Sequence, residues 1–284
     1  MSKIIISADS VCDLGPELKQ RCNVNYYPFH VILEDKQYGD GVDITPDEIF
    51  DVYRKKKVLP KTAAINATEY VDYFRQWTDE GYEVIHITLG SGFSAVYTNC
   101  CLAAKELPGI YPINSKCLST GTGHLVIEAA VRAAYGMSAA QIQAEVSDLA
   151  SKVRASFVID NLEFLHKGGR CSALAALGAN LLGLKPCIEV DCNTGGQMNV
   201  GKKYRGSLEK ALAQYTADKL AQYENIRTDK IFITHSGVPD ELIDIVRDKI
   251  NAAMKFDNIY VTRAGCTISA HCGPGTLGIL FMTE

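Results

Sequence analysis

The sequence predicts an α/β protein of two lobes, an N-terminal lobe built as a mostly parallel α/β/α sandwich and a C-terminal lobe of α+β type. Its 284 residues exceed the length of one typical domain. The first half alternates short β-branched runs with amphipathic segments, which favours parallel strands joined by helices. The second half contains Asn193-Thr194-Gly195-Gly196, a turn signal typical of an antiparallel hairpin. We expect the two lobes to comprise residues 1–158 and 159–284.

The composition is that of an ordinary globular protein. Hydrophobic residues make up 47% of the chain and charged residues 22%, which argues against a disordered or membrane-spanning protein. The formal net charge of −4, with one dense basic run at residues 54–57, argues against a nucleic-acid partner. The first apolar run, residues 4–6, is too short for a signal peptide. We therefore expect a cytoplasmic protein whose contact with membranes is at most transient.

Elements of the first half are predicted from hydrophobic periodicity and capping signals. Thr45-Pro46-Asp47-Glu48 combines an N-cap, a proline at the first helical position and a capping-box glutamate, and residues 66–69 repeat the capping-box spacing. The predicted strands are residues 3–8, 24–33, 84–89 and 110–114, with an extended segment at 60–65 and a polar turn at 34–41; predicted helices begin near residues 13, 45, 66 and 95 and span 122–134 and 138–150.

Elements of the second half are shorter at first and then alternate between strand and helix. The predicted helices are residues 161–166, 207–223 and 240–256, and the predicted strands are 186–190, 198–200, 230–234, 258–262 and 278–282. We interpret Leu174, Leu177 and Leu181 as ordinary core residues, because nothing in their pattern indicates another role.

The most informative stretch is a buried strand, residues 84–89, followed by the turn Gly90-Ser91-Gly92-Phe93-Ser94 and a helix. Two glycines permit the sharp reversal, and Ser94 is placed to act as the N-cap. Because the first N–H groups of a helix lack intrahelical partners, a turn of this kind can hold a carboxylate or a phosphate. The alternative is that the glycines and Ser94 only form the turn and cap the helix.

The chain contains ten cysteines and no secretion signal, so we expect these residues to be reduced, buried and structural. Cys187 and Cys192 are separated by four residues, and Cys266, His271 and Cys272 fall together. Neither spacing matches a zinc knuckle or ribbon. We therefore expect neither a metal site nor a cofactor.

A set of short motifs extends over the whole chain. They are Asp9-Ser10 with Asp13-Leu14, Pro60-Lys61-Thr62, Ser91-Gly92-Phe93-Ser94, Leu165-His166-Lys167-Gly168-Gly169-Arg170 with Ser172, Leu184-Lys185-Pro186, and His271-Cys272-Gly273-Pro274-Gly275. With this set in this order, the chain resembles the DegV family. The resemblance implies that one long-chain fatty acid is held in a tunnel between the two lobes. It also implies a lipid-binding role in phospholipid metabolism, in which a protein that is not itself an enzyme presents the fatty acid carboxylate to the ATP-binding subunit of a fatty acid kinase for acyl-phosphate formation.

The same resemblance implies a set of ligand-binding residues. Thr62 and Ser94 would hold the carboxylate with their hydroxyl groups, and His271 would donate to it from the second lobe. Gly273, in the adjoining Gly-Pro-Gly turn, would belong to the same site. Arg170 would lie at the mouth of the tunnel and assist phosphoryl transfer in the partner, and no residue of this chain would be catalytic.

Two departures from the family's pattern concern the surroundings of the head group. Many relatives follow the threonine with Ser-Gln, where this chain has Ala63-Ala64, and relatives often have Ser-Gly-Thr where this chain has residues 94–96. These departures bear on the shape of the pocket and on the preferred acyl chain. An enclosed tail is favoured by about 0.8 kcal/mol per buried CH₂, and the desolvated carboxylate needs hydrogen-bond donors.

Two other functions remain open from the sequence. Ser94 could be the nucleophile of a hydrolase that acts on lipids or esters, with His271 or His235 as the base, although the glycine expected two residues after the serine of a nucleophile elbow is missing. The chain could also be a sensor of a small molecule or a phosphosugar. Lipid in an organic extract of the purified protein would separate the fatty acid interpretation from both.

Overall fold

The structure is a computed structural model that describes residues 3–172 and 183–284, and within these ranges the strands form three sheets. The first half contributes a parallel sheet of four strands in the order β2-β1-β6-β7. Its strands are β1 Ile4–Asp9, β2 Val24–Tyr27, β6 Glu83–Thr88 and β7 Ile110–Asn114. The predicted parallel α/β arrangement of the N-terminal lobe is confirmed.

The second half forms a six-stranded sheet in the order β10-β9-β8-β13-β11-β12, which is antiparallel except for the pair β11 and β12. Its strands are β8 Val153–Val158, β9 Leu184–Asp191, β10 Gln197–Arg205, β11 Ile231–Ser236, β12 Ile259–Arg263 and β13 Thr276–Met282. The predicted hairpin joins β9 to β10, and both Gly195 and Gly196 have positive φ. The division of the chain at residue 158 stays a proposal; β8, which ends there, pairs with β9 and β13.

Ten helices position these sheets in the described part of the chain. They are α1 Pro16–Arg21, α2 Pro46–Lys56, α3 Ala67–Thr78, α4 Val96–Glu106, α5 Ser119–Ala134, α6 Ala139–Leu149, α7 Leu162–Gly168, α8 Leu208–Ala221, α9 Asp240–Ala253 and α10 Cys266–Cys272. The predicted capping boxes form at Thr45 with Glu48 and at Asn66 with Glu69. None of the described helices is long and apolar enough to cross a membrane.

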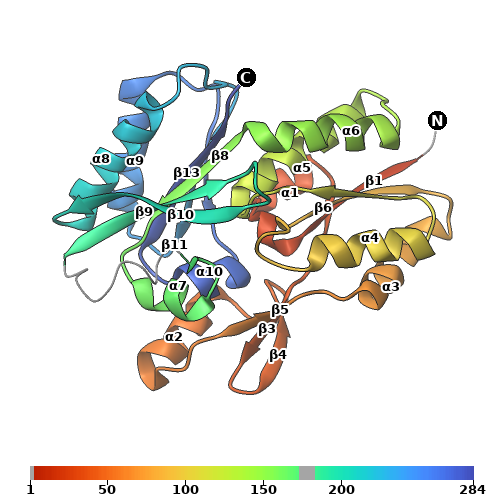
Figure 1. Cartoon of the computed structure of the whole chain (residues 1–284), viewed down its shortest axis with the longest axis horizontal. Coiled ribbons are helices and arrows are strands. Elements are labelled where there is room, and N and C mark those ends of the chain that lie inside the picture. Colours follow the sequence, from red (N-terminus) through yellow and green to blue (C-terminus); the bar gives the residue numbers. More distant parts are fainter. Residues whose placement is uncertain (1–2, 173–182) are drawn as a thin grey trace.

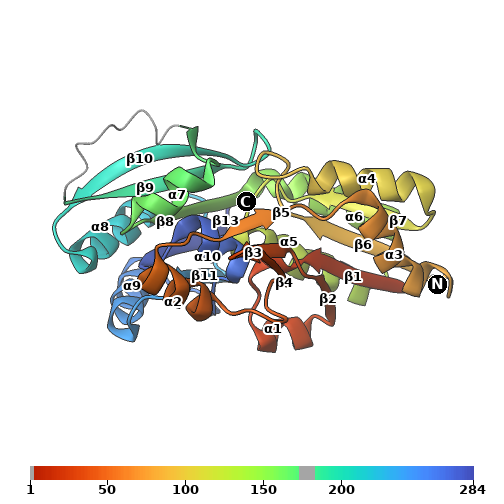
Figure 2. The same ribbon diagram turned by 90° about the horizontal axis from the view of Figure 1, so that it is seen from below.

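The two large sheets lie side by side, with α8 and α9 on one side of the molecule and α3, α4 and α6 on the other (Figure 1). Helix α5 lies between them and contacts β1 and β6 of one sheet and β8, β11 and β13 of the other. A small third sheet, β4-β3-β5, lies beside α2 and near α7 and α10 (Figure 2). Its strands are β3 His30–Leu33, β4 Lys36–Gly39 and β5 Lys61–Ala63.

One hydrophobic core is shared by both large sheets. It includes Ile85 and Ile87 on β6, Leu125 on α5, and Phe157 and Leu280 on the six-stranded sheet. Helix α5 thus covers part of each sheet on the side that faces the other lobe. Burial of this much apolar surface on both sides of α5 holds the two halves in a fixed relation.

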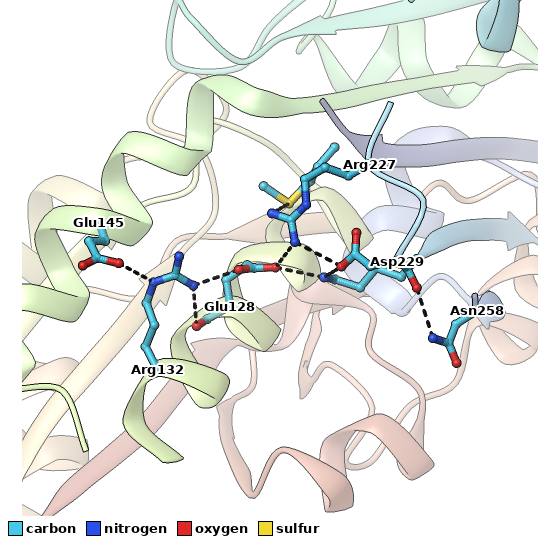
Figure 3. A network of polar contacts seen from close by, with 8 residues as sticks. Glu128, Arg132, Glu145, Arg227, Asp229 and Asn258 are labelled. Atoms are coloured by element: carbon cyan, nitrogen blue, oxygen red, sulfur yellow. Dashed lines mark hydrogen bonds and ion pairs between the residues drawn. The ribbon is translucent and has the colours of Figure 1, made fainter. Parts of the chain in front are cut away.

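Polar contacts reinforce the same junction (Figure 3). Glu128 on α5 forms ion pairs with Arg132 at 2.8 Å, with Arg227 at 3.0 Å and with Lys230 at 2.9 Å. Burial by itself would raise the pKa of Glu128, but Lys230, Arg132 and Arg227 lower it to about 2. The carboxylate therefore stays ionised and links α5 to the segment that leads into β11.

The structure differs from the predicted elements at four places. The predicted strand 24–33 is divided into β2 and β3 at Pro28, which has no N–H to continue a ladder. The predicted polar turn 34–41 contains the strand β4. Helix α10 was not predicted. The N-cap of α4 is Ala95, so the prediction that Ser94 is the N-cap was wrong. The predicted core residues Leu174, Leu177 and Leu181 lie outside the described residues.

Candidate functional site

A cavity of about 170 Å³ lies where strand β5, the turn after β6 and helix α10 meet. Its walls are mostly apolar, and they include Phe29, Leu89, Phe93, Leu118, Leu165 and Met198. Polar side chains also border it; they are Thr62, Ser94, Arg170, Thr267 and His271. The cavity thus combines a hydrophobic wall with a small group of hydrogen-bonding side chains, as ligand pockets commonly do.

Four of the five residues singled out from the sequence border this cavity. Thr62, Ser94, Arg170 and His271 contribute to its lining. Gly273 does not; it ends α10 with a φ of 73°, and a Cβ at this position would lie 2.8 Å from the ring of Phe164. Gly273 therefore allows the chain to turn away from α10 against Phe164.

Thr62 and His271 form the central contact of the site. The hydroxyl of Thr62 on β5 lies 2.9 Å from Nε2 of His271 on α10. Burial, with a smaller contribution from the nearby charge of Arg170, lowers the pKa of His271 to about 4, so the imidazole is neutral near pH 7. Nδ1 of His271 is buried and has no hydrogen-bond partner in the described part of the chain. A neutral imidazole carries one N–H, so His271 can offer one donor to a ligand or to Thr62.

Ser94 is carried by a turn that is held from two sides. The backbone N–H of Leu89 donates to Asp9 at 2.9 Å, and that of Gly92 donates to the carbonyl of Gly195 in the β9–β10 hairpin at 2.8 Å. A Cβ on Gly90 would lie 2.8 Å from the carbonyl oxygen of Gly195, so the close approach of the hairpin requires glycine there. Because Ala95 is the N-cap of α4, the hydroxyl of Ser94 is not used for capping.

Asp9 is the buried anchor of this turn. Its carboxylate accepts from the hydroxyl of Tyr70 at 2.7 Å and lies 3.1 Å from Nε2 of His86, in addition to the bond from Leu89. His86 lies on β6 and Tyr70 on α3, while Leu89 directly follows β6 at the start of the turn. Asp9 therefore fixes the start of the turn relative to the parallel sheet.

Helix α10, which carries His271, is held by acidic residues from the first half of the chain. Asp40 accepts from the backbone N–H groups of Cys266 at 2.7 Å and Thr267 at 3.2 Å. Asp13 accepts from the N–H of Gly265 at 2.8 Å, and burial raises the pKa of Asp13 to about 8. These bonds satisfy the first N–H groups of α10.

Sequence reasoning missed Asp40 and Thr267. Asp40 lies in a stretch predicted as a polar turn, and its bonds reach residues more than 220 positions away, so no local signal identifies it. Thr267 lies on the helix that was not predicted.

Arg170 lies at the outer edge of the cavity. It follows the end of α7, where Gly169 has a positive φ of 67°, and its side chain is exposed. One guanidinium nitrogen donates to the carbonyl of Gly168 at 2.7 Å. Gly168 also packs against His271, since a Cβ there would lie 2.5 Å from Nδ1. The guanidinium of Arg170 carries further N–H donors beside the one bonded to Gly168.

A second, smaller cavity of about 30 Å³ adjoins the first. Leu118, Ile268 and Cys272 border both, and Phe157 and Gly278 lie on the far side. Its lining comes from α5, α10 and the six-stranded sheet. The apolar space near Thr62 and His271 therefore continues toward the core shared by the two sheets.

A metal site requires a group of His, Cys, Asp or Glu side chains close together. Among residues 3–172 and 183–284, no group of three or more His, Cys, Asp or Glu side chains is placed to hold a metal ion. The cysteines are buried apart from Cys22 and Cys101, which are half-buried.

Comparison with known proteins gives a consistent result over the whole chain. Residues 3–284 match the family model described as an uncharacterised protein of the DegV family. The chain is 28% identical to a DegV domain-containing protein of Clostridium perfringens, with 100% of both chains covered.

Solved structures agree with this match. A fatty acid-binding DegV family protein from Thermus thermophilus superposes with a TM-score of 0.90 at 26% identity, covering 99% of this chain and 100% of the other. A stearic acid-binding protein from Eubacterium ventriosum superposes with a TM-score of 0.84 at 25% identity, covering 100% and 98%. The chain belongs to the DegV family.

Proposed function

We propose that this protein binds one long-chain fatty acid, with its carboxylate held by Thr62, Ser94 and His271. The observation that carries the proposal is the cavity itself, because these three side chains come from separate elements and border one space whose other walls are mostly apolar. The fatty acid-binding relatives from Thermus thermophilus and Eubacterium ventriosum support the same ligand class.

The physical chemistry of the cavity suits a fatty acid. Each buried CH₂ of the tail contributes about 0.8 kcal/mol, and the tail would run from the larger cavity into the smaller one as Leu118 and Ile268 move apart. The carboxylate loses water on entry, which two hydroxyl groups and a neutral imidazole N–H offset. Because burial keeps the imidazole of His271 neutral, it can donate without a second buried charge.

We further propose that the bound fatty acid is presented to the ATP-binding subunit of a fatty acid kinase. In that reaction a carboxylate oxygen attacks the γ-phosphorus of ATP, the bond to the β-phosphate oxygen breaks, and acyl phosphate and ADP are formed. Two anions must approach each other, so a cation beside them would lower the barrier. Arg170 is exposed at the edge of the cavity, and among the described residues its guanidinium is bonded to the carbonyl of Gly168 through one nitrogen. Because this proposed partner uses ATP, we also propose that the protein acts in the cytoplasm.

The competing hydrolase is less well supported. The imidazole Nε2 of His271 is hydrogen-bonded to Thr62, and in the part of the chain that the structure describes no histidine is hydrogen-bonded to Ser94. Nδ1 of His235 instead lies 3.4 Å from the N–H of Val238. A Ser nucleophile needs a base within hydrogen-bonding distance.

Mass spectrometry of an organic extract tests the ligand class. We expect about one long-chain fatty acid per chain in the purified protein. Extracts without lipid, together with no uptake of added oleic acid by the delipidated protein, would refute the proposal. Turnover of a chromogenic ester that disappears in Ser94→Ala would favour the hydrolase instead.

A further inference from the structure

The hydroxyl of Thr267 is buried and has no hydrogen-bond partner among the residues that the structure describes. The residue is 3% exposed, and its Oγ1 makes no hydrogen bond to any described residue. Nearby hydroxyl groups are satisfied, since Ser269 donates to the carbonyl of Ala264 at 3.2 Å and Thr276 to that of Cys272 at 2.8 Å. A buried hydroxyl without a partner lowers the stability of the folded protein, and such groups are uncommon. A bond to a ligand would explain why a hydroxyl is present at this position.

Thr267 belongs to the same cavity as Thr62, Ser94 and His271. It lies on α10 four residues before His271, so the two side chains share one face of the helix. Helical side chains lean toward the N-terminus, which brings the ring of His271 back over the turn that carries Thr267. The backbone N–H of Thr267 is held by Asp40 at 3.2 Å, so its hydroxyl can change direction chiefly by rotation of the side chain.

We infer that the hydroxyl of Thr267 is a fourth donor to the carboxylate of the bound fatty acid. This inference rests on the proposed function and adds a residue to its head-group site. A carboxylate has two oxygens with about four acceptor positions, and Thr62, Ser94 and His271 fill three of them. Thr267 is the remaining hydroxyl on the lining of the cavity among the described residues.

Thr267 differs from Thr62 and His271 in its existing hydrogen bonds. Thr62 and His271 are already bonded to each other at 2.9 Å, so their bonds to a ligand are formed partly at the expense of that contact. Thr267 has no bond to give up in the described structure. A bond from its hydroxyl to a charged oxygen is therefore gained almost in full.

The valine variant separates this role from a structural one. Thr267→Val removes the hydroxyl while keeping the shape of the side chain. We expect the urea midpoint of the ligand-free protein to rise, because an unsatisfied buried group is lost, and the affinity for oleic acid to fall about tenfold or more. Thr267→Ser keeps the hydroxyl and should stay within a few fold of the wild-type affinity. The measurement is displacement of a fluorescent fatty acid from delipidated protein.

A matched control comes from another buried threonine. Thr216 on α8 donates to the carbonyl of Leu212 at 2.8 Å and does not border the cavity. Thr216→Val should lower the urea midpoint and leave the affinity unchanged, so it should differ from Thr267→Val on both readouts.

Each outcome decides the inference. Wild-type affinity in Thr267→Val overturns it, and so does a loss of affinity in Thr267→Ser as large as in Thr267→Val, since that would make the threonine structural. If wild-type protein takes up no fatty acid, the proposed function fails and this inference with it. If wild-type protein binds and Thr267→Val binds equally well, this inference alone fails.

Discussion

Thr62 and His271 are hydrogen-bonded at 2.9 Å although 209 residues separate them in the chain. Thr62 lies on β5, an edge strand of the small sheet β4-β3-β5. His271 lies on α10, which comes just before β13 in the chain. The contact thus joins the two halves of the chain at the cavity. A ligand that inserts between these two side chains would bind to both halves at once.

Removing either hydroxyl of the proposed head-group site should weaken binding. We expect Ser94→Ala and Thr62→Val each to reduce fatty acid affinity roughly ten- to a hundredfold, since a hydrogen bond to a charged group contributes about 1.5 to 3 kcal/mol. Displacement of a fluorescent fatty acid measures this. Ser138→Ala, which removes the N-cap of α6 away from the cavity, should cost about 1 kcal/mol of stability and leave affinity intact. Unchanged affinity in both site variants would remove Ser94 and Thr62 from the site.

Asp40 should control the site without touching the ligand. Asp40→Ala removes the acceptor for the N–H groups of Cys266 and Thr267, so α10 and His271 lose their fixed position. We expect lower affinity for fatty acid together with a loss of about 1 to 3 kcal/mol in the free energy of unfolding. Asp43, which accepts from the N–H of Gly39 in the neighbouring exposed turn, is the control, and Asp43→Ala should bind normally. Equal affinities for the two variants would show that α10 is held by other contacts.

Arg170 should separate binding from presentation. Arg170→Ala is expected to keep fatty acid affinity within a few fold, because the side chain is exposed and lies at the edge of the cavity. It should lose most acyl-phosphate formation when the ATP-binding subunit of a fatty acid kinase is supplied, since the cation helps the transition state more than the bound state. Lys167→Ala, a neighbouring exposed cation, should retain the activity. Normal phosphorylation by Arg170→Ala would assign Arg170 a structural role only.

The neutral His271 should make stability depend on pH. Burial lowers its pKa from 6.5 to about 4, so between these values the unfolded chain binds a proton that the folded protein does not. Its contribution to stability is present above pH 6.5 and lost as the pH falls toward 4, on the order of 3 kcal/mol. Asp13 acts in the opposite direction, because burial raises its pKa from 3.8 to about 8 and its contribution is lost as the pH rises through that range.

Comparison of His271→Asn with the wild type isolates the histidine from Asp13. Urea denaturation of ligand-free protein at pH 7, 5.5 and 4.5 should give a smaller fall in the free energy of unfolding for the variant. His124 provides a second case away from the head-group residues, since burial lowers its pKa to about 4 as well. Parallel curves for His271→Asn and the wild type would contradict a buried neutral His271.

Local signals in the sequence determined a large part of the fold. The helices after Thr45 and Asn66 begin where their capping boxes predict, and β7 has the predicted bounds Ile110–Asn114. The turn at Gly195 and Gly196 forms the predicted hairpin. These features depend on residues within about four positions of one another, so the sequence can specify them without the rest of the chain.

Other features were decided only by the tertiary structure. Helix α10 has seven residues and no side-chain cap of its own, and Asp13 and Asp40 satisfy its first N–H groups from more than 220 residues away. Ser94, expected as an N-cap, instead borders the cavity because the chain begins the helix one residue later, after Ala95. The hydroxyl of Thr267, which lacks a partner in the described part of the chain, has no signature in the sequence, since burial and hydrogen bonding depend on which distant elements pack around a side chain.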